Sequence, residues 1–331
     1  MKITIILLLA ISFVIALVPH ALYVVVKTIS ILYRFRCPYR PYGLTALALV
    51  VLWLVLAVYG NLWGRFKFEQ KDVTLSFATL PEVFDGYRVV HVSDFHLGGW
   101  IGHEQRIQQI VDSINALHAD AILFTGDLVS LSEEELTTFI PILSRLHARD
   151  GVFSVLGNHD YMPYTRSWSQ RERDGHVRRL QQMEREQLGW TLLTNGNAIV
   201  RRGTDSIAVC GTENSSLGVH SVVVRGDMAK TVSGTDGCFR ILLRHDPTMW
   251  RAEVLGKYDV PLTLSGHTHG GQMSVLGLFY VSTFIYKEHA GLYTENDQQL
   301  YVNIGLGATM PMRVGAVPEI TLITLKKRQG R

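Results

Sequence analysis

The feature that most constrains this 331-residue chain is a pair of long apolar segments near its start. The first segment, residues 3–18 (ITIILLLAISFVIALV), contains no charged side chain, and apolar residues continue to Val26. The second segment, residues 44–59 (LTALALVVLWLVLAVY), reaches a similar length when it is extended to Trp63. A helix needs about 20 mostly apolar residues to cross a bilayer. The sequence therefore predicts two transmembrane helices, at about residues 3–26 and 44–63.

These helices would form a membrane anchor over residues 1–70, followed by one globular domain over residues 71–331. Aromatic side chains lie at the segment ends, where membrane interfaces favour them, namely Tyr39, Tyr42, Tyr59 and Trp63. A cleaved signal peptide is the alternative for the first segment, although VPHA is a poor cleavage site. Basic residues do not fix the orientation, because the connecting loop and the opposite side carry equal numbers of them.

The globular part begins with an alternation of strand and helix patterns. Residues 87–93 (YRVVHVS), 121–125 (AILFT) and 152–156 (VFSVL) are typical of strands. Apolar residues at helical spacing predict one helix over residues 103–119 and another that contains Leu136 to Leu146. The part after residue 190 is rich in strand patterns. This order predicts an α/β fold with a largely parallel first sheet, and two sheets covered by helices.

The net charge, the cysteines and the absence of certain motifs argue against several classes of function. The formal net charge of +3 is too small to suggest a nucleic-acid partner. Cys210 and Cys238 could form a disulfide or remain free thiols. The sequence contains no phosphate-binding Walker A loop, no serine-hydrolase G-x-S-x-G turn and no paired C-x-x-C motif.

Polar side chains follow five successive predicted strands. The sites of open α/β sheets lie outside the carboxyl ends of the strands, so these residues are expected to converge. Asp-x-His and His-x-His spacing would place both side chains on one side of extended backbone, within reach of a common metal pair. Glycines around the last histidines would let the backbone fold tightly around an ion, although a simple surface turn is the alternative. The five segments are SDFH (93–96), GDLV (126–129), GNHD (157–160), RHDP (244–247) and GHTHGGQ (266–272).

Together these motifs resemble the calcineurin-like metallophosphoesterase superfamily over roughly residues 85–325. The resemblance is greatest to a membrane-associated bacterial phosphodiesterase branch, which is similar to enzymes that cleave UDP-2,3-diacylglucosamine. It implies a sandwich of two mixed β-sheets flanked by helices. It also implies two divalent metal ions (Mn, Fe, Zn or Co), with Asp127 bridging. The first metal would be held by Asp94, His96, Asp127 and His269, and the second by Asp127, Asn158, His245 and His267.

The resemblance further implies a reaction in which metal-bound hydroxide attacks the phosphorus of a phosphodiester or pyrophosphate. It gives His159 the role of protonating the leaving oxygen or stabilising the charged phosphate; a purely supporting histidine is the alternative. Two carboxylates against two divalent ions would leave a positive centre that attracts an anionic substrate. Phosphomonoesterase or nucleotide phosphodiesterase activity, and a metal-bearing interaction module without turnover, are the alternative functions.

Two further expectations concern the surroundings of the site. The arginine-rich segment 161–190 follows the GNHD motif and could be a lid over the site, or a solvated helix with an apolar stripe. The short connection between the apolar segments and the globular domain favours a lipid-linked phosphoester as substrate. The expected location is the bacterial cytoplasmic (inner) membrane, with a multi-pass anchor and the catalytic domain on the extracytoplasmic side, as in exported relatives.

Overall fold

The computed structural model describes residues 2–217, 223–275 and 277–329. The chain divides into two compact units. The first unit contains Met1–Arg65 and Met310–Val314, and the second contains Phe66–Thr309 and Gly315–Arg331.

The first unit consists of two long helices and the short segment Met310–Val314. Helix α1 spans Lys2–Leu32 and helix α2 spans Arg40–Leu62, and the two pack against each other. Both are long and apolar enough to cross a membrane. Only 6% and 22% of their most apolar stretches are buried within the protein. This exposure argues against buried core helices, because a core helix hides its apolar side chains.

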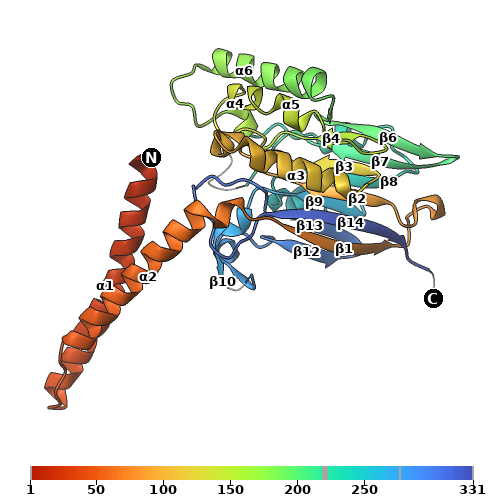
Figure 1. Cartoon of the computed structure of the whole chain (residues 1–331). Helices are drawn as coiled ribbons and strands as arrows, with labels where there is room; N and C mark the ends of the chain where they lie inside the picture. Colours follow the sequence, from red (N-terminus) through yellow and green to blue (C-terminus); the bar gives the residue numbers. More distant parts are fainter. Residues whose placement is uncertain (1, 218–222, 276, 330–331) are drawn as a thin grey trace. The chain divides into compact units, whose positions relative to one another are not determined.

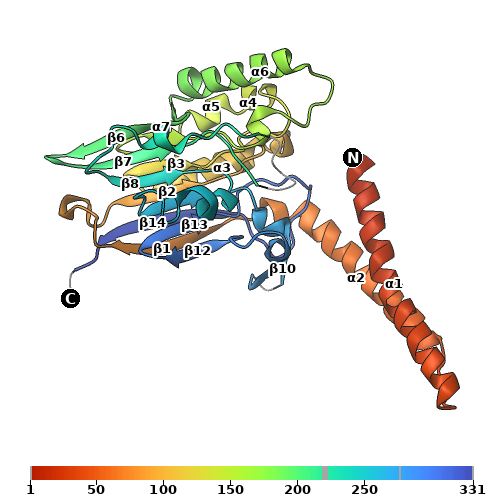
Figure 2. The same cartoon turned by 180° about the vertical axis from the view of Figure 1, so that it is seen from behind.

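The second unit is built around two six-stranded mixed sheets (Figures 1 and 2). The first sheet has the order β1-β14-β2-β3-β4-β5, in which the β14–β2 pair alone is antiparallel. Its strands are Glu69–Phe77, Glu319–Lys327, Arg88–Val92, Ala121–Phe124, Val152–Ser154 and Thr191–Leu192.

The second sheet has the order β12-β13-β9-β8-β7-β6, with antiparallel pairs at its two edges and parallel pairs between them. Its strands are Gly291–Glu295, Gln298–Val302, Leu262–Ser265, Phe239–Leu243, Asp205–Gly211 and Gly196–Arg202. A separate two-stranded ribbon pairs β10 (Ser274–Val275) with β11 (Phe279–Tyr280).

The alternation of side chains along the strands divides the core into layers. In β2, Val90 and Val92 face the helical side and share a cluster with Ile107 of α3 (Glu104–Ala116) and Leu180 of α6 (Gln170–Gln182). Val89 points the other way, into the apolar layer between the two sheets. A third cluster on the outer face of the second sheet includes Met228 of α7 (Met228–Val232). The result is a helix–sheet–sheet–helix sandwich, which confirms the predicted α/β fold with two mixed sheets.

The helix predicted around Leu136 to Leu146 is wrong in one respect. The structure has two short helices here, α4 (Glu134–Thr137) and α5 (Ile140–Leu143). Pro141 explains the interruption, because proline lacks the N–H that a continuous helix would use and fits the first turn of a new one. Cys210 and Cys238 are both free thiols.

One buried acid in this core makes the stability of the fold depend on pH. Glu184 is completely buried, and its carboxylate accepts a hydrogen bond from the Ser154 hydroxyl at the end of β4 (2.7 Å). Burial and the negative charge of Asp160 raise the pKa of Glu184 to about 8, against 4.5 in the unfolded chain. The folded state therefore holds an extra proton between these values. Its contribution to stability is complete below pH 4.5 and is lost as pH rises through 8.

We expect Glu184→Gln to remove this pH dependence, because the amide stays neutral. Relative to wild type, the free energy of unfolding of the variant should rise by on the order of 3 kcal/mol between pH 5 and pH 8. Chemical unfolding of the detergent-solubilised chain at both pH values measures it. Glu186→Gln, an exposed neighbour, is the matched control. The prediction is contradicted if the free energies of unfolding of Glu184→Gln and wild type differ by the same amount at pH 5 and at pH 8.

Candidate metal centre

The predicted site residues lie where the central strands of both sheets end. Asp94 and His96 follow β2, Asp127 follows β3, and Asn158 and His159 follow β4 in the first sheet. His245 follows β8, and His267 and His269 follow β9 in the second sheet. The structure brings all eight together, at one end of the sandwich. All are buried except His159 and His267, which are partly exposed.

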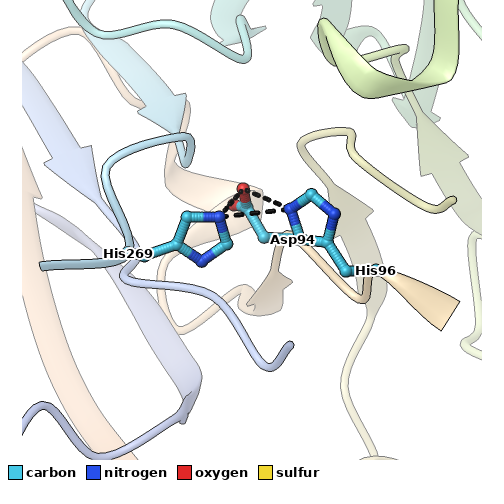
Figure 3. Close-up of side chains that lie close together, drawn as sticks. All are labelled: Asp94, His96 and His269. Atoms are coloured by element: carbon cyan, nitrogen blue, oxygen red, sulfur yellow. Dashed lines mark hydrogen bonds and ion pairs between the residues drawn. The ribbon is translucent and has the colours of Figure 1, made fainter. Parts of the chain in front are cut away.

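Asp94, His96 and His269 form the first group of possible ligands (Figure 3). The Nε2 atoms of His96 and His269 lie 3.1 Å apart. Oδ1 of Asp94 lies 3.4 Å from Nε2 of His269 and 3.8 Å from Nε2 of His96. Figure 3 shows the carboxylate and both rings pointing toward one another, from the segment after β2 and the segment after β9. One small cation could contact all three atoms.

Asp127, His245 and His267 form the second group. Nε2 of His245 lies at its centre, 3.2 Å from Oδ2 of Asp127 and 3.2 Å from Nδ1 of His267. Oδ1 of Asn158 lies 3.1 Å from the same nitrogen. The amide nitrogen of Asn158 donates instead to the Tyr164 hydroxyl (2.9 Å), which turns the carbonyl oxygen toward the histidines.

Asp127 belongs to the second group and also lies beside His96 of the first group. Its Oδ2 lies 3.2 Å from Nε2 of His245 and 3.5 Å from Nε2 of His96. Its Oδ1 accepts a hydrogen bond from the backbone N–H of His159 (2.8 Å), which fixes the orientation of the carboxylate. The geometry is therefore compatible with a bridging role for Asp127, and the ligand roles themselves stay predictions.

The chemistry of these groups fits divalent cations. Oδ1 of Asp94 is completely buried and accepts no hydrogen bond from any residue that the structure describes. Its nearest neighbours are imidazole nitrogens, so a cation would satisfy an otherwise unpaired charge. Mixed imidazole and carboxylate ligands suit Mn, Fe, Zn or Co. Burial opposes the protonation of His245, but the charge of Asp127 raises its pKa to about 10. A metal ion would displace that proton.

The backbone conformation corrects one argument from the sequence. We expected extended backbone to place Asp94 and His96, and likewise His267 and His269, on one side. Instead all four residues have positive φ angles (53°, 48°, 74° and 50°), as does Asp127 (58°). Left-handed backbone is unfavourable for residues with a side chain and costs of order 1 kcal/mol or more each. Asn158 has helical backbone angles and is not extended either.

The glycines of the GHTHGGQ segment differ in what they make room for. A Cβ on Gly266 would clash with Oδ2 of Asp94, so this glycine lets the backbone approach a candidate ligand closely. Gly270 and Gly271 have positive φ angles, and a Cβ on either would lie 2.6 Å from the next segment. On Gly270 it would meet the ring of Tyr280, and on Gly271 the backbone nitrogen of Ser282. Gly270 and Gly271 therefore make room for β11 and the turn that follows it, and not for an ion.

The imidazole ring of His159 is oriented so that Nδ1 points away from the two groups of possible ligands. Its Nδ1 lies 2.8 Å from the Ser130 carbonyl oxygen, which requires a proton on Nδ1. The ring stands edge-on to His96, with centroids 4.7 Å apart, and contacts Tyr164 at 4.4 Å. The other nitrogen is therefore available to the centre, next to His96 and Asp127.

Three supporting residues were not predicted from the sequence. Asp246 accepts hydrogen bonds from Thr248 through Oδ1, and its Oδ2 lies 3.5 Å from Nε2 of His267. The Tyr286 hydroxyl lies 3.2 Å from the same nitrogen. The Tyr164 hydroxyl binds Asn158, as described above. In the sequence, only the position of Asp246 next to His245 indicated a supporting role. Tyr164 and Tyr286 stand outside the five motifs, and no sequence pattern indicated their contacts.

We expect Asp246→Asn to weaken metal binding by about 10- to 100-fold, because a carboxylate behind a ligating imidazole orients the ring and raises its basicity. The loss should affect one of two bound metals, since Asp246 faces only His267. Metal titration followed by calorimetry measures it, with Asp236→Asn at a fully exposed position as the control. Unchanged affinity for both metals contradicts this role.

The segment 161–190 contains the predicted helix with an apolar stripe, and the lid stays a prediction. Val177, Leu180 and Met183 are buried in the helical side of the core, so α6 packs on the domain through its apolar stripe. Tyr164 lies before the helix and reaches the centre through Asn158 and His159. The loop therefore covers part of the centre, whereas the helix supports it.

Several known proteins are similar to this chain. The profile of the calcineurin-like phosphoesterase family matches residues 87–271. A "transmembrane protein with metallophosphoesterase domain" from Danio rerio is 33% identical over 86% of this chain, which spans 63% of that protein's length. The "uncharacterized metallophosphoesterase YkuE" of Bacillus subtilis is 32% identical over 78% of this chain and 85% of its own. The solved structure of TT1561 of Thermus thermophilus covers 67% of this chain and 90% of its own, at 15% identity and a TM-score of 0.42.

Proposed function

Since the chain belongs to the calcineurin-like phosphoesterase family, and is a metal-dependent phosphoric ester hydrolase, we propose that it is anchored in a membrane and cleaves a phosphodiester or pyrophosphate bond with two metal ions. Asp94, His96, Asp127 and His269 would hold one ion. Asp127, Asn158, His245 and His267 would hold the other. The observation that carries the proposal is the place of the Asp127 carboxylate between the two groups.

The bound ions and the residues around them would have different roles in the reaction. Bound divalent ions would supply a nucleophile at neutral pH and withdraw charge from the phosphoryl group. In its doubly protonated form, His159 would donate its Nε2 proton to the leaving oxygen and keep the Nδ1 proton that the Ser130 carbonyl accepts. The Tyr164 hydroxyl, hydrogen-bonded to Asn158, lies where it would contact the same substrate.

The proposal also includes membrane anchoring and a lipid-linked substrate. The two apolar helices support anchoring, and so does the printed name of the zebrafish relative. UDP-2,3-diacylglucosamine is one candidate, since it joins a pyrophosphate to acyl chains. We place the protein in a bacterial cytoplasmic membrane with the catalytic unit on the extracytoplasmic side, which a reporter fused to the C-terminus would test.

A phosphomonoesterase or a nucleotide phosphodiesterase could use the same site. The discriminating experiment is hydrolysis of bis-p-nitrophenyl phosphate and p-nitrophenyl phosphate by the full chain in detergent, after chelation and addition of Mn, Zn, Fe or Co. We expect the diester to be cleaved faster and only with metal. Faster cleavage of the monoester would support the first alternative. Metal binding without hydrolysis of either ester would support a non-catalytic module.

A further inference from the structure

The ribbon that follows the metal-binding histidines exposes an unusual concentration of apolar side chains. Residues 274–286 contain no charged residue. We call the described residues 274–275 and 277–285 the apolar hairpin; they comprise β10, β11 and the short helical turn Val281–Phe284. Its exposed side chains, with exposed fractions, are Leu278 (85%), Phe284 (79%), Val275 (66%), Ile285 (63%), Phe279 (48%) and Val281 (40%).

These side chains lie together on one element. The rings of Phe279 and Phe284 are in edge-to-face contact, with centroids 5.6 Å apart. Figures 1 and 2 show β10 projecting beyond the end of the two large sheets. Scattered single apolar residues are ordinary on a protein surface, whereas a contiguous patch marks an interaction site.

The apolar hairpin is attached rigidly to the candidate metal centre. Its root packs on Gly270 and Gly271, directly after His269, with no space for a side chain on either glycine. Its far end leads into Tyr286, whose hydroxyl lies 3.2 Å from Nε2 of His267. The hairpin is therefore in contact with the centre at both of its ends.

We propose that the apolar hairpin inserts into the surface of the bilayer that holds α1 and α2, so that the metal centre acts on phosphoesters at the level of the lipid headgroups. The inference rests on the proposed membrane anchoring and deepens the proposed function, since it makes the substrate class a phosphoester embedded in the bilayer.

Two observations favour a bilayer over another protein. Residues 63–68 alone connect α2 to β1, and extended chain reaches at most about 3.5 Å per residue, so the second unit cannot leave the vicinity of the bilayer. The first charged residue after the hairpin is the exposed Lys287, which suits anionic headgroups beside an inserted apolar element.

Depth measurement tests the inference without requiring activity. The full chain is reconstituted in phosphatidylglycerol-containing bilayers after Cys37→Ser and Cys238→Ser; Cys210 is buried and is retained. A spin label is attached at Leu278→Cys or, as a matched control, at the exposed Val83→Cys. At position 278 we expect the ratio of collisions with oxygen to collisions with a water-soluble nickel complex to exceed that at 83 by about fivefold or more. Free access of nickel to position 278, or exclusion of both reagents by a protein partner, overturns the inference.

An activity measurement then separates this inference from the proposed function. We compare bis-p-nitrophenyl phosphate with a diacylglycerol p-nitrophenyl phosphodiester embedded in the same bilayer. The variant Leu278→Ser/Phe284→Ser should lose about tenfold or more in kcat/KM for the embedded substrate and keep its activity on the soluble one. Val83→Ser/Val224→Ser should change neither. Equal activity of both variants on the embedded substrate overturns the inference, whereas a wild-type chain inactive on both esters contradicts the proposed function alone.

Discussion

Replacing Asp127 with Asn should abolish hydrolysis, with a loss of about 1,000-fold or more in kcat for bis-p-nitrophenyl phosphate. The asparagine side chain keeps the size of aspartate and one carbonyl oxygen, but it loses the negative charge. In wild type, Oδ2 of Asp127 lies 3.2 Å from Nε2 of His245 and 3.5 Å from Nε2 of His96. Burial alone would raise the pKa of Asp127, yet the charges on His245 and His159 hold it well below its usual range. Asp127 is therefore the anion on which both groups depend.

The metal content distinguishes this explanation from simple misfolding. Two equivalents per chain are expected in wild type and one or fewer in Asp127→Asn, with a similar unfolding temperature for both metal-free proteins. Asp112→Asn, on the exposed face of α3, should bind metal and hydrolyse the ester like wild type. A fully loaded Asp127→Asn protein would show that Asp127 does not bridge the metals, whatever its activity.

The fold could be predicted largely from the sequence, because a strand–helix alternation allows few arrangements. Parallel strands end at the same side of a sheet, so the residues after 92, 124 and 154 had to lie near one another. The contribution of the second sheet, through His245 and the two histidines after β9, followed from the family motifs. No local pattern predicts which edges of two sheets meet.

The geometry of the centre could not be predicted, because its backbone is not the one that each segment prefers locally. Positive φ angles at Asp94, His96 and Asp127 are maintained by contacts from distant parts of the chain. For example, the backbone N–H of His96 donates to the Asp127 carbonyl, and that of Gly307 donates to the Asp94 carbonyl. Such contacts exist only after the sheets have assembled. The exposed hairpin, in contrast, had a visible signal in its lack of charge.

His159→Ala should lower kcat by an amount that depends on the leaving group, and this dependence is the test of a proton donor. p-Nitrophenolate leaves without much help, so bis-p-nitrophenyl phosphate should lose only about tenfold, whereas an alkyl diester should lose about 100- to 10,000-fold. Both metals should stay bound, because His159 is oriented by the Ser130 carbonyl rather than by either group. His147→Ala, at an exposed histidine outside the centre, is the matched control.

An equal loss for good and poor leaving groups would exclude proton donation and leave His159 the alternative role of stabilising charge on the phosphoryl group. A loss of metal would instead make it a supporting residue for His96, whose ring lies edge-on to it. We expect neither of these outcomes, and propose proton donation as the role of His159. A nitrogen that carries a proton toward Ser130 keeps the ring fixed, and the opposite nitrogen then has no function in the fold except toward whatever binds between His96 and Asp127.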